Sequence, residues 1–247
     1  LFRSMMNLGG DERIYPASMT KIMTALLTIE NLPDLNETIT VPEDIFEELT
    51  AQDASVAGFN PYEQPTVRDL LYGVLLPSGA DACETLARAV GGSEEGFVAM
   101  MNQKAEELGL TNTHFENCTG LHNDNHYSTC RDIAVLMSEC LKSDTFREIV
   151  TREVYTTEAT ASHPEGITLY DTMLHRFTSY EMSTTLENGA VIEGGKTGFT
   201  DEAGQCLVSF AEYGGEEYIL VTAEAMTDSG SAVDSIADAS TVYGRLQ

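Results

Sequence analysis

The segment from Met19 to Ile29 constrains the fold more than any other stretch, because it has helical periodicity and is apolar nearly all round. One face follows the i, i+3, i+4, i+7 spacing and the opposite face adds further apolar residues: Ile22, Ala25, Leu26 and Ile29, then Met23 and Leu27. Such a helix has no face suited to water. We therefore expect it at the centre of the domain, with Ser18 at its N-terminal end.

The remaining elements are predicted from periodicity and from the residues that start and stop regular structure. Helices are expected over 66–76, 81–90, 94–108, from an N-cap at Ser128 to 141, and over 232–246. Strands are expected over 1–8, 191–193, 205–212 and 217–224, the last two joined as a hairpin across Gly214-Gly215. Residues 111–127 are typical of a surface loop, and 151–168 show no clear period.

This order of elements predicts an α+β fold, with a mostly helical central region and an antiparallel sheet formed by N- and C-terminal strands. A chain of 247 residues can bury a sizeable core, and we expect a single catalytic domain over residues 1–247. The sequence begins at Leu1 and has neither a signal peptide nor a membrane-spanning run. We interpret it as trimmed at its N-terminus, with no C-terminal accessory domain.

The charge balance excludes one class of partner. Thirteen Lys and Arg against forty Asp and Glu give a net charge of −27. Such a surface repels phosphate backbones, so we expect no nucleic-acid partner. The rare basic residues are correspondingly informative, and two of the four lysines, Lys21 and Lys196, lie in the motifs described below.

Five cysteines show no CxxC pair and no zinc-ligand spacing. We interpret most of them as small buried hydrophobic residues. Because their number is odd, at least one is unpaired within the chain. A bridge from Cys118 to Cys130 or Cys140 remains an alternative at this stage.

The first chemistry-bearing pattern is Ser18-Met19-Thr20-Lys21. A spacing of three places the hydroxyl and the amine on one face of a helix. A neutral lysine can take the proton of a serine nucleophile, and burial together with a second nearby cation favours that neutral form. The alternative is a capping serine with a surface lysine, but a lone charge in so apolar a helix would be costly.

Two further patterns suit a substrate site. Pro77-Ser78-Gly79-Ala80 lies between two predicted helices, where a tight turn can present a hydroxyl to a cleft, although it can equally be a simple helix cap. Residues 194–200, GGKTGFT, combine a cation, a hydroxyl and glycines that allow close backbone approach. They fit a carboxylate-bearing substrate along a strand edge, or else a Gly-rich turn with a solvated lysine.

SxxK, the Ser78 turn and KTG occur here in the order found in penicillin-binding proteins and serine β-lactamases. The strings around them are more specific: YPASMTKIMTALL, LLPSGADAC, TNTHFENCTGLHNDNHYST and GGKTGFTDEAGQCLV. They resemble the low-molecular-mass penicillin-binding proteins that act as serine-type D-Ala-D-Ala carboxypeptidases. The resemblance extends from about Ile14 to the C-terminal helix and implies a serine β-lactamase/transpeptidase-like fold.

The resemblance implies a role for each matching residue. Ser18 would be the acylated nucleophile, Lys21 its general base, and Ser78 a proton relay to the leaving group. The backbone N–H groups of Ser18 and Phe199 would form the oxyanion hole. The substrate-binding residues would be Lys196, Thr197, Gly198, Phe199 and Ala80, with Lys196 and Thr197 holding the terminal carboxylate of a peptide or the acid group of a β-lactam.

The resemblance further implies a peptidoglycan stem peptide ending in D-Ala-D-Ala as substrate, and β-lactams as covalent inhibitors. It implies no cofactor and no metal, an extracytoplasmic location facing the cell wall, and membrane contact only through segments absent from this chain. His122 and His126 flank Asp124, but without a fourth ligand we interpret HxDxH as loop structure and not as a metal site.

Ala80 departs from the family pattern, where the turn is usually Ser-x-Asn. That amide would bridge the catalytic lysine and the substrate backbone, so its loss affects substrate positioning and turnover. Two rival functions follow. One is a β-lactamase, although residues 111–127 resemble the carboxypeptidase pattern. The other is a penicillin-binding sensor or scaffold that is acylated without turnover, which Ala80 keeps in consideration.

Overall fold

The computed structural model describes residues 4–225 and 233–247. Its main sheet contains β3 (Val191–Thr200), β4 (Gly204–Tyr213) and β5 (Glu216–Ala225), all antiparallel and in that spatial order. The hairpin across Gly214-Gly215 is confirmed. The strand predicted at 191–193 is longer than expected and continues through the whole KTG segment, so that segment lies within an edge strand of the sheet.

The α+β class is confirmed, but the strand predicted over residues 1–8 is wrong for its described part. Residues 4–8 form no strand, while 1–3 lie outside the described residues. Met5, Met6 and Leu8 are 67%, 52% and 86% exposed. Pairing in a sheet is stabilised by burial of one face, and this segment buries none, so the sheet is built from the C-terminal strands.

The helices of the described residues include all six that were predicted and three short ones, over 45–51, 144–150 and 174–179, that were not. Residue 232, where the last helix was expected to begin, lies outside the described residues. In chain order the helices are the 3₁₀ turn η1 (Ala17–Thr20), α1 (Lys21–Asn31), α2 (Ile45–Ala51), α3 (Val67–Leu75), α4 (Ala80–Gly91), α5 (Glu94–Glu107), α6 (Cys130–Cys140), α7 (Asp144–Val150), α8 (Leu174–Ser179) and α9 (Asp234–Tyr243). The cap predicted at Ser128 is one residue early. Thr129 caps α6 by accepting the N–H of Asp132, whereas Ser128 forms a β-bridge with Ile14. The unassigned stretch after α7 forms a hairpin of β1 (Val154–Thr156) and β2 (Thr168–Tyr170).

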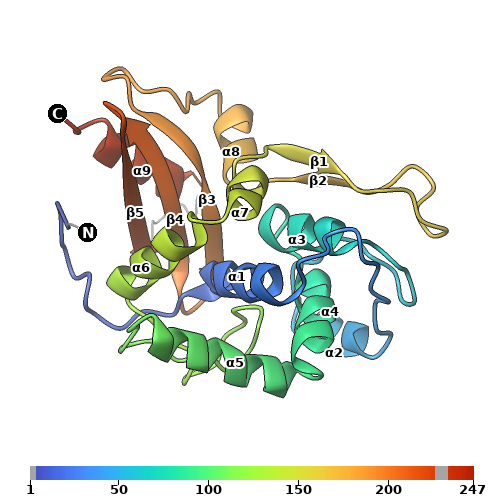
Figure 1. Ribbon diagram of the computed structural model, residues 1–247. Helices are drawn as coiled ribbons and strands as arrows, with labels where there is room; N and C mark the ends of the chain where they lie inside the picture. Colours follow the sequence, from blue (N-terminus) through green and yellow to red (C-terminus); the bar gives the residue numbers. More distant parts are fainter. Residues whose placement is uncertain (1–3, 226–232) are drawn as a thin grey trace.

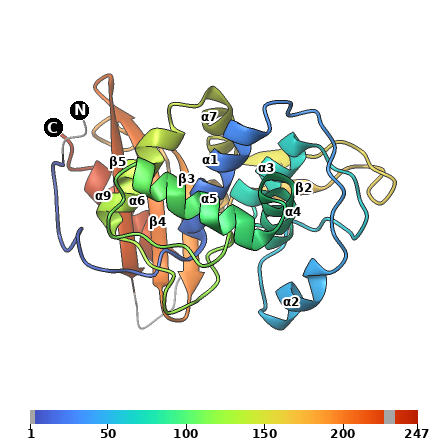
Figure 2. The ribbon, with the colours of Figure 1, turned by 60° about the horizontal axis from the view of Figure 1, so that its bottom comes forward.

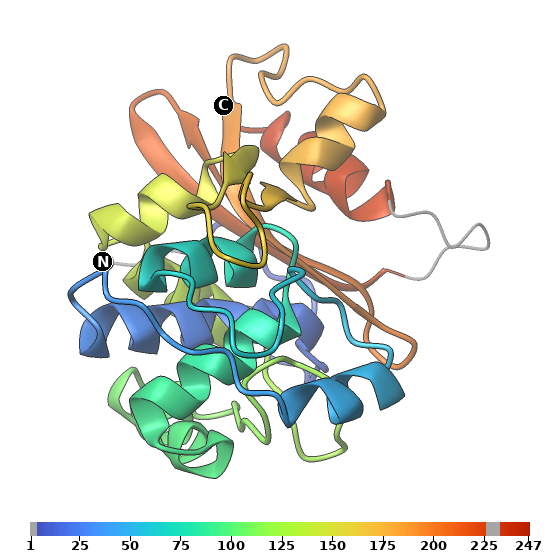
Figure 3. The ribbon, with the colours of Figure 1, turned by 90° about the vertical axis from the view of Figure 1, so that its right-hand side faces the viewer.

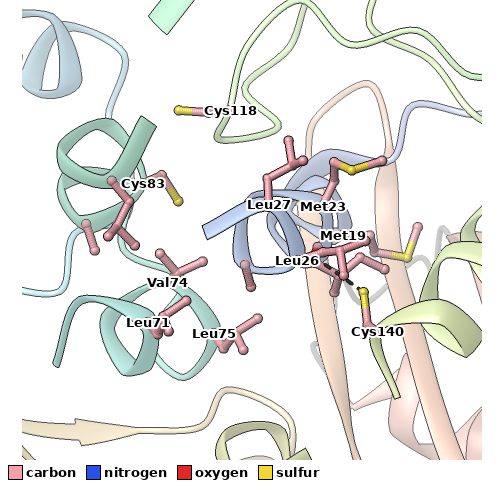
Figure 4. Packing of buried hydrophobic residues seen from close by; sticks show 14 of the residues in the cluster. Met19, Met23, Leu26, Leu27, Leu71, Val74, Leu75, Cys83, Cys118 and Cys140 are labelled. Carbon is pink, nitrogen blue, oxygen red and sulfur yellow. Dashed lines mark hydrogen bonds between the residues drawn. The ribbon is translucent and has the colours of Figure 1, made fainter. Parts of the chain in front are cut away.

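Helix α1 lies at the centre of the molecule, as its all-round apolar pattern predicts. Figure 1 shows it between the strands β3–β5 and the helices α3 and α4, and Figure 2 shows the same arrangement from another direction. All of its residues from Lys21 to Thr28 are buried. In Figure 4 the side chains of Met23, Leu26 and Leu27 are surrounded by residues of α3 and by Cys83, Cys118 and Cys140.

The sheet is covered on both faces, which explains why β4 is apolar almost throughout. Cys206, Val208 and Phe210 point into the large core around α1, while Leu207 and Ala211 join a second cluster with α9. Figure 3 shows α9 in red and α1 in blue on opposite sides of the strands. The edge strand β3 is thereby held rigidly next to the start of α1.

All five cysteines lie in the described part of the chain and all are free, so the bridge from Cys118 is not formed. Cys130 is partly exposed and the other four are buried, which fits their interpretation as small core residues. Among the described residues, no helix has the length and apolar character needed to span a bilayer.

Candidate active site

Ser18 and Lys21 meet at the start of α1. Ser18 lies in η1, and the α-helix expected from Met19 begins two residues later, at Lys21. The Nζ atom of Lys21 donates to Ser18 Oγ at 2.9 Å. Lys21 is only 3% exposed, and this burial lowers the pKa of its ammonium group. The pair therefore has the geometry and the environment of a serine with its base.

A loop from 117 to 121 supplies a second acceptor for Lys21. The carbonyl oxygen of Thr119 accepts from Lys21 Nζ at 2.7 Å. Asn117 orders this loop, because its Oδ1 accepts the N–H groups of Thr119 and Gly120 and its amide donates to the Leu121 carbonyl. A backbone carbonyl cannot take a proton, so this contact only holds the lysine amine in place.

Gly120 brings this loop against η1, the turn that contains Ser18. Its φ is +84°, a conformation that glycine adopts without strain. A Cβ atom at this position would lie 1.9 Å from the carbonyl oxygen of Ala17 and 3.0 Å from the amide nitrogen of Ser18. The loop and η1 are therefore in direct backbone contact, which only glycine permits.

The turn predicted at 77–80 joins α3 to α4, as expected. Ser78 has φ +67°, an uncommon value for a residue with a side chain, and it is 6% exposed. Its hydroxyl is buried without a hydrogen bond to any described residue. The carboxylate of Asp81 anchors the turn by accepting the N–H groups of Ala57, Gly58 and Phe59. Ala80 is 1% exposed, and its N–H donates to the Ser55 carbonyl at 2.7 Å.

Strand β3 forms the opposite side of the site. Lys196 and Thr197 are 1% and 6% exposed, whereas Phe199 is 54% exposed. A Cβ at Gly198 would lie 3.0 Å from the Pro16 carbonyl and 3.1 Å from the Ser18 amide nitrogen. The KTG backbone therefore runs directly beside Ser18.

The two motif lysines are electrostatic neighbours. Burial lowers the pKa of Lys196, and repulsion from Lys21 lowers it further, whereas the Asp171 carboxylate acts in the opposite direction. Asp171 is 1% exposed, and burial raises the pKa of its carboxyl group. The two amines are thus close enough for Lys21 to lower the pKa of Lys196, while the pKa of Lys21 itself is lowered by its burial.

The HxDxH residues do not converge on one point. His126 is buried; its Nδ1 accepts the N–H of Glu116, so its hydrogen lies on Nε2, which contacts Thr20 Oγ1 at 2.8 Å. Burial lowers the pKa of His126 to about 3, so the ring is neutral at physiological pH. His122 instead lies 3.4 Å from Asp124 and 3.7 Å from Glu202. His126 thus ties the loop to η1, in agreement with a structural role.

Among the described residues, one group of potential metal ligands joins the 117–121 loop to α4 and α5. Side-chain atoms of Glu84, Glu94 and Cys118 lie within 4.8 Å of one another. Burial, with the Glu94 carboxylate adding to it, raises the pKa of Glu84 to about 8, and burial raises the pKa of the Cys118 thiol well above its usual range. The thiol donates to Glu84 at 3.4 Å, and the Cys118 N–H donates to Glu94 at 3.2 Å. These two hydrogen bonds connect the loop to α4 and α5.

The structure thus brings Ser18 and Lys21 together and places KTG beside them, while Ser78 makes no hydrogen bond to either of the first two. Sequence analysis missed three contributors: the Thr119 carbonyl, the Asn117 side chain that positions it, and Thr172, whose hydroxyl lies 2.6 Å from that of Thr197. Thr119 and Asn117 lie within 111–127, the stretch that was interpreted as a surface loop, whereas Thr172 lies outside it.

The profile of peptidase S11, described as D-alanyl-D-alanine carboxypeptidase, matches residues 4–227. The chain belongs to this family of serine-type carboxypeptidases. Among relatives, D-alanyl-D-alanine carboxypeptidase DacF of Bacillus subtilis is 36% identical over 90% of this chain. The D-alanyl-D-alanine carboxypeptidase of Streptomyces sp. strain K15 is 36% identical over 85% of it. DacC of Escherichia coli is 34% identical over 88% of it.

The chain spans about half the length of DacF and DacC, 54% and 52%, and 72% of the Streptomyces relative. Solved structures agree with the family assignment. The crystal structure of the Streptomyces K15 DD-transpeptidase has a TM-score of 0.81 at 31% identity, covering 97% of this chain and 91% of that one. Penicillin-binding protein 5 of Haemophilus influenzae has a TM-score of 0.77 at 27% identity, covering 94% and 64%. The predicted fold family is therefore confirmed.

Proposed function

We propose that this S11 chain is the catalytic domain of a D-Ala-D-Ala carboxypeptidase that removes the terminal D-Ala from peptidoglycan pentapeptide. The observation that carries the proposal is the 2.9 Å contact between Ser18 Oγ and the buried amine of Lys21, next to KTG on an open strand edge. Each step below uses groups of this chain. The substrate places the enzyme outside the cytoplasm, facing the cell wall.

In the first half-reaction Lys21, in its neutral form, takes the Ser18 proton while Oγ attacks the carbonyl of the penultimate D-Ala. The N–H groups of Ser18 and Phe199 stabilise the oxyanion, and Lys196 and Thr197 hold the terminal carboxylate. The tetrahedral intermediate then expels D-Ala, whose nitrogen receives the proton through Ser78. Water, activated by Lys21, finally hydrolyses the ester on Ser18. A β-lactam, bound through its acid group, acylates Ser18 in the same way.

The purified chain is expected to release D-Ala from a diacylated peptide ending in D-Ala-D-Ala, and its penicilloyl adduct is expected to decay slowly. Released D-Ala and adduct mass are measured in parallel, with glycine present in one series so that product mass separates hydrolysis from transfer to an amine. Rapid, repeated penicillin hydrolysis with no D-Ala release would establish a β-lactamase instead. A stable adduct with no D-Ala release would establish a sensor.

Ala80→Asn is expected to change kcat/KM for this peptide less than tenfold. In the family pattern an Asn here would accept from Lys21 and donate to the peptide, and such bonds to charged groups contribute about 1.5–3 kcal/mol. In this chain Lys21 already has two acceptors, at 2.9 and 2.7 Å, so its position does not depend on residue 80. Steady-state kinetics of the wild type and of Ala80→Asn measure this change in kcat/KM. A gain above tenfold, about 1.4 kcal/mol, would contradict this and favour the weakened sensor.

A further inference from the structure

A threonine outside every sequence motif lies in direct contact with the KTG segment. Thr172 Oγ1 is 2.6 Å from Thr197 Oγ1, so one of the two hydroxyl groups donates to the other. Thr197 is 6% exposed, and Thr172 is half-buried. In the proposed function the Thr197 hydroxyl binds the substrate carboxylate. The same hydroxyl therefore has a second hydrogen-bond partner within the protein, Thr172.

The position of Thr172 is itself tightly fixed. Its N–H donates to the Leu76 carbonyl, immediately before the Ser78 turn. The preceding residue, Asp171, is buried, and its Oδ1 accepts the N–H groups of Met173 and Leu174 at 2.9 and 2.7 Å. Thr172 thus connects the turn after α3 to strand β3, with its side chain directed at Thr197.

The chemistry of a carboxylate sets the direction of this hydroxyl pair. An ionised carboxylate only accepts hydrogen bonds, so Thr197 must donate its single hydrogen to it. Thr197 can then interact with Thr172 only as an acceptor, and Thr172 must be the donor. A hydroxyl that accepts while it donates is polarised, which strengthens its bond to the carboxylate.

We propose that Thr172 is a positioning residue that orients the Thr197 hydroxyl toward the terminal carboxylate and so contributes to selectivity for substrates with a free acid end. This inference rests on the proposed function, because it takes the carboxylate subsite from it. It adds a residue that acts through Thr197 and does not itself need to contact the substrate.

The test measures kcat/KM of wild type and of Thr172→Val on two peptides that differ only at the C-terminus. The valine keeps the shape of threonine and removes its hydroxyl. One ends in D-Ala-D-Ala and the other in D-Ala-D-Ala amide. We expect wild type to prefer the free acid, and Thr172→Val to lose about tenfold in kcat/KM on the acid but less than twofold on the amide. Thr172→Ser is expected to restore the preference. Acylation by benzylpenicillin and by its methyl ester gives the same comparison without peptide turnover.

A matched control is available in the β1–β2 hairpin. Thr168 and Thr156 form another threonine hydroxyl pair, at 3.3 Å, outside the site. Thr168→Val should leave both peptides unaffected. Equal losses of kcat/KM for Thr172→Val on the acid and on the amide would show a merely structural role and overturn the inference. An unchanged preference for the acid in Thr172→Val, or a wild type with no preference for the acid, would also overturn it. A wild type that releases no D-Ala but whose penicilloylation responds as expected refutes the proposed function and leaves the inference standing.

Discussion

Replacing Ser18 with alanine is expected to abolish penicillin labelling and to lower kcat/KM for D-Ala release by more than about 10⁴-fold. The physical reason is that acylation requires the oxygen that Lys21 contacts at 2.9 Å, and no water can form the same covalent intermediate. Intact-protein mass spectrometry after incubation with benzylpenicillin measures the adduct, and peptide mapping locates it. One adduct per wild-type chain is expected, on the peptide that contains Ser18.

Ser4→Ala serves as the control, since Ser4 is exposed and its hydroxyl donates to the nearby Met6 carbonyl. It should be labelled like wild type. An adduct that survives in Ser18→Ala would show that another side chain is the nucleophile. Thermal unfolding of both variants checks that the loss is chemical, because removal of one partly exposed hydroxyl should cost little stability.

The second large effect is expected from Gly120→Ala, which adds a single methyl group. That methyl would lie 1.9 Å from the Ala17 carbonyl, and the backbone would have to keep φ near +84°. Overpacking and left-handed strain together predict a loss of about 2–4 kcal/mol in the free energy of unfolding. Any displacement of the loop also shifts the Thr119 carbonyl from Lys21, and a shift near 1 Å can cost about 100-fold in activity.

Gly109→Ala separates the two causes. Gly109 has φ +72°, but a Cβ there would meet nothing within 4 Å. This variant should lose only about 1 kcal/mol, from backbone strain, and should keep wild-type activity. Denaturant unfolding and penicillin acylation rates are measured for both variants. Equal effects at the two glycines would contradict the contact between the 117–121 loop and η1.

The part of the site that sequence predicted is the part encoded locally. The three-residue spacing of Ser18 and Lys21 already places them together on one helical turn, and the all-apolar face of α1 predicts the burial that lowers the lysine pKa. The hairpin strands and most helices followed for the same reason, since each depends on short-range periodicity and on its own stop signals.

The remaining contributors depend on partners far away in the chain. Thr119 reaches Lys21 across 98 residues, and Thr172 reaches Thr197 from a stretch for which no element was predicted. A backbone carbonyl leaves no mark on composition, so the acceptor role of Thr119 could not be predicted. The prediction of an N-terminal strand was wrong for the opposite reason. Residues 4–8 have strand-like composition, but nothing in the described fold buries them.

Helix α1 is synthesised long before strand β3. Ser18 and Lys21 are near the start of the chain, whereas Lys196 and Phe199 are in β3, which pairs with β4 only after residue 204 has been added. In the proposed mechanism, a growing chain therefore carries Ser18 through most of its synthesis without the strand that would bind the carboxylate and supply the second oxyanion donor. Under that mechanism the chain can be acylated only after β3 and β4 have been synthesised and paired.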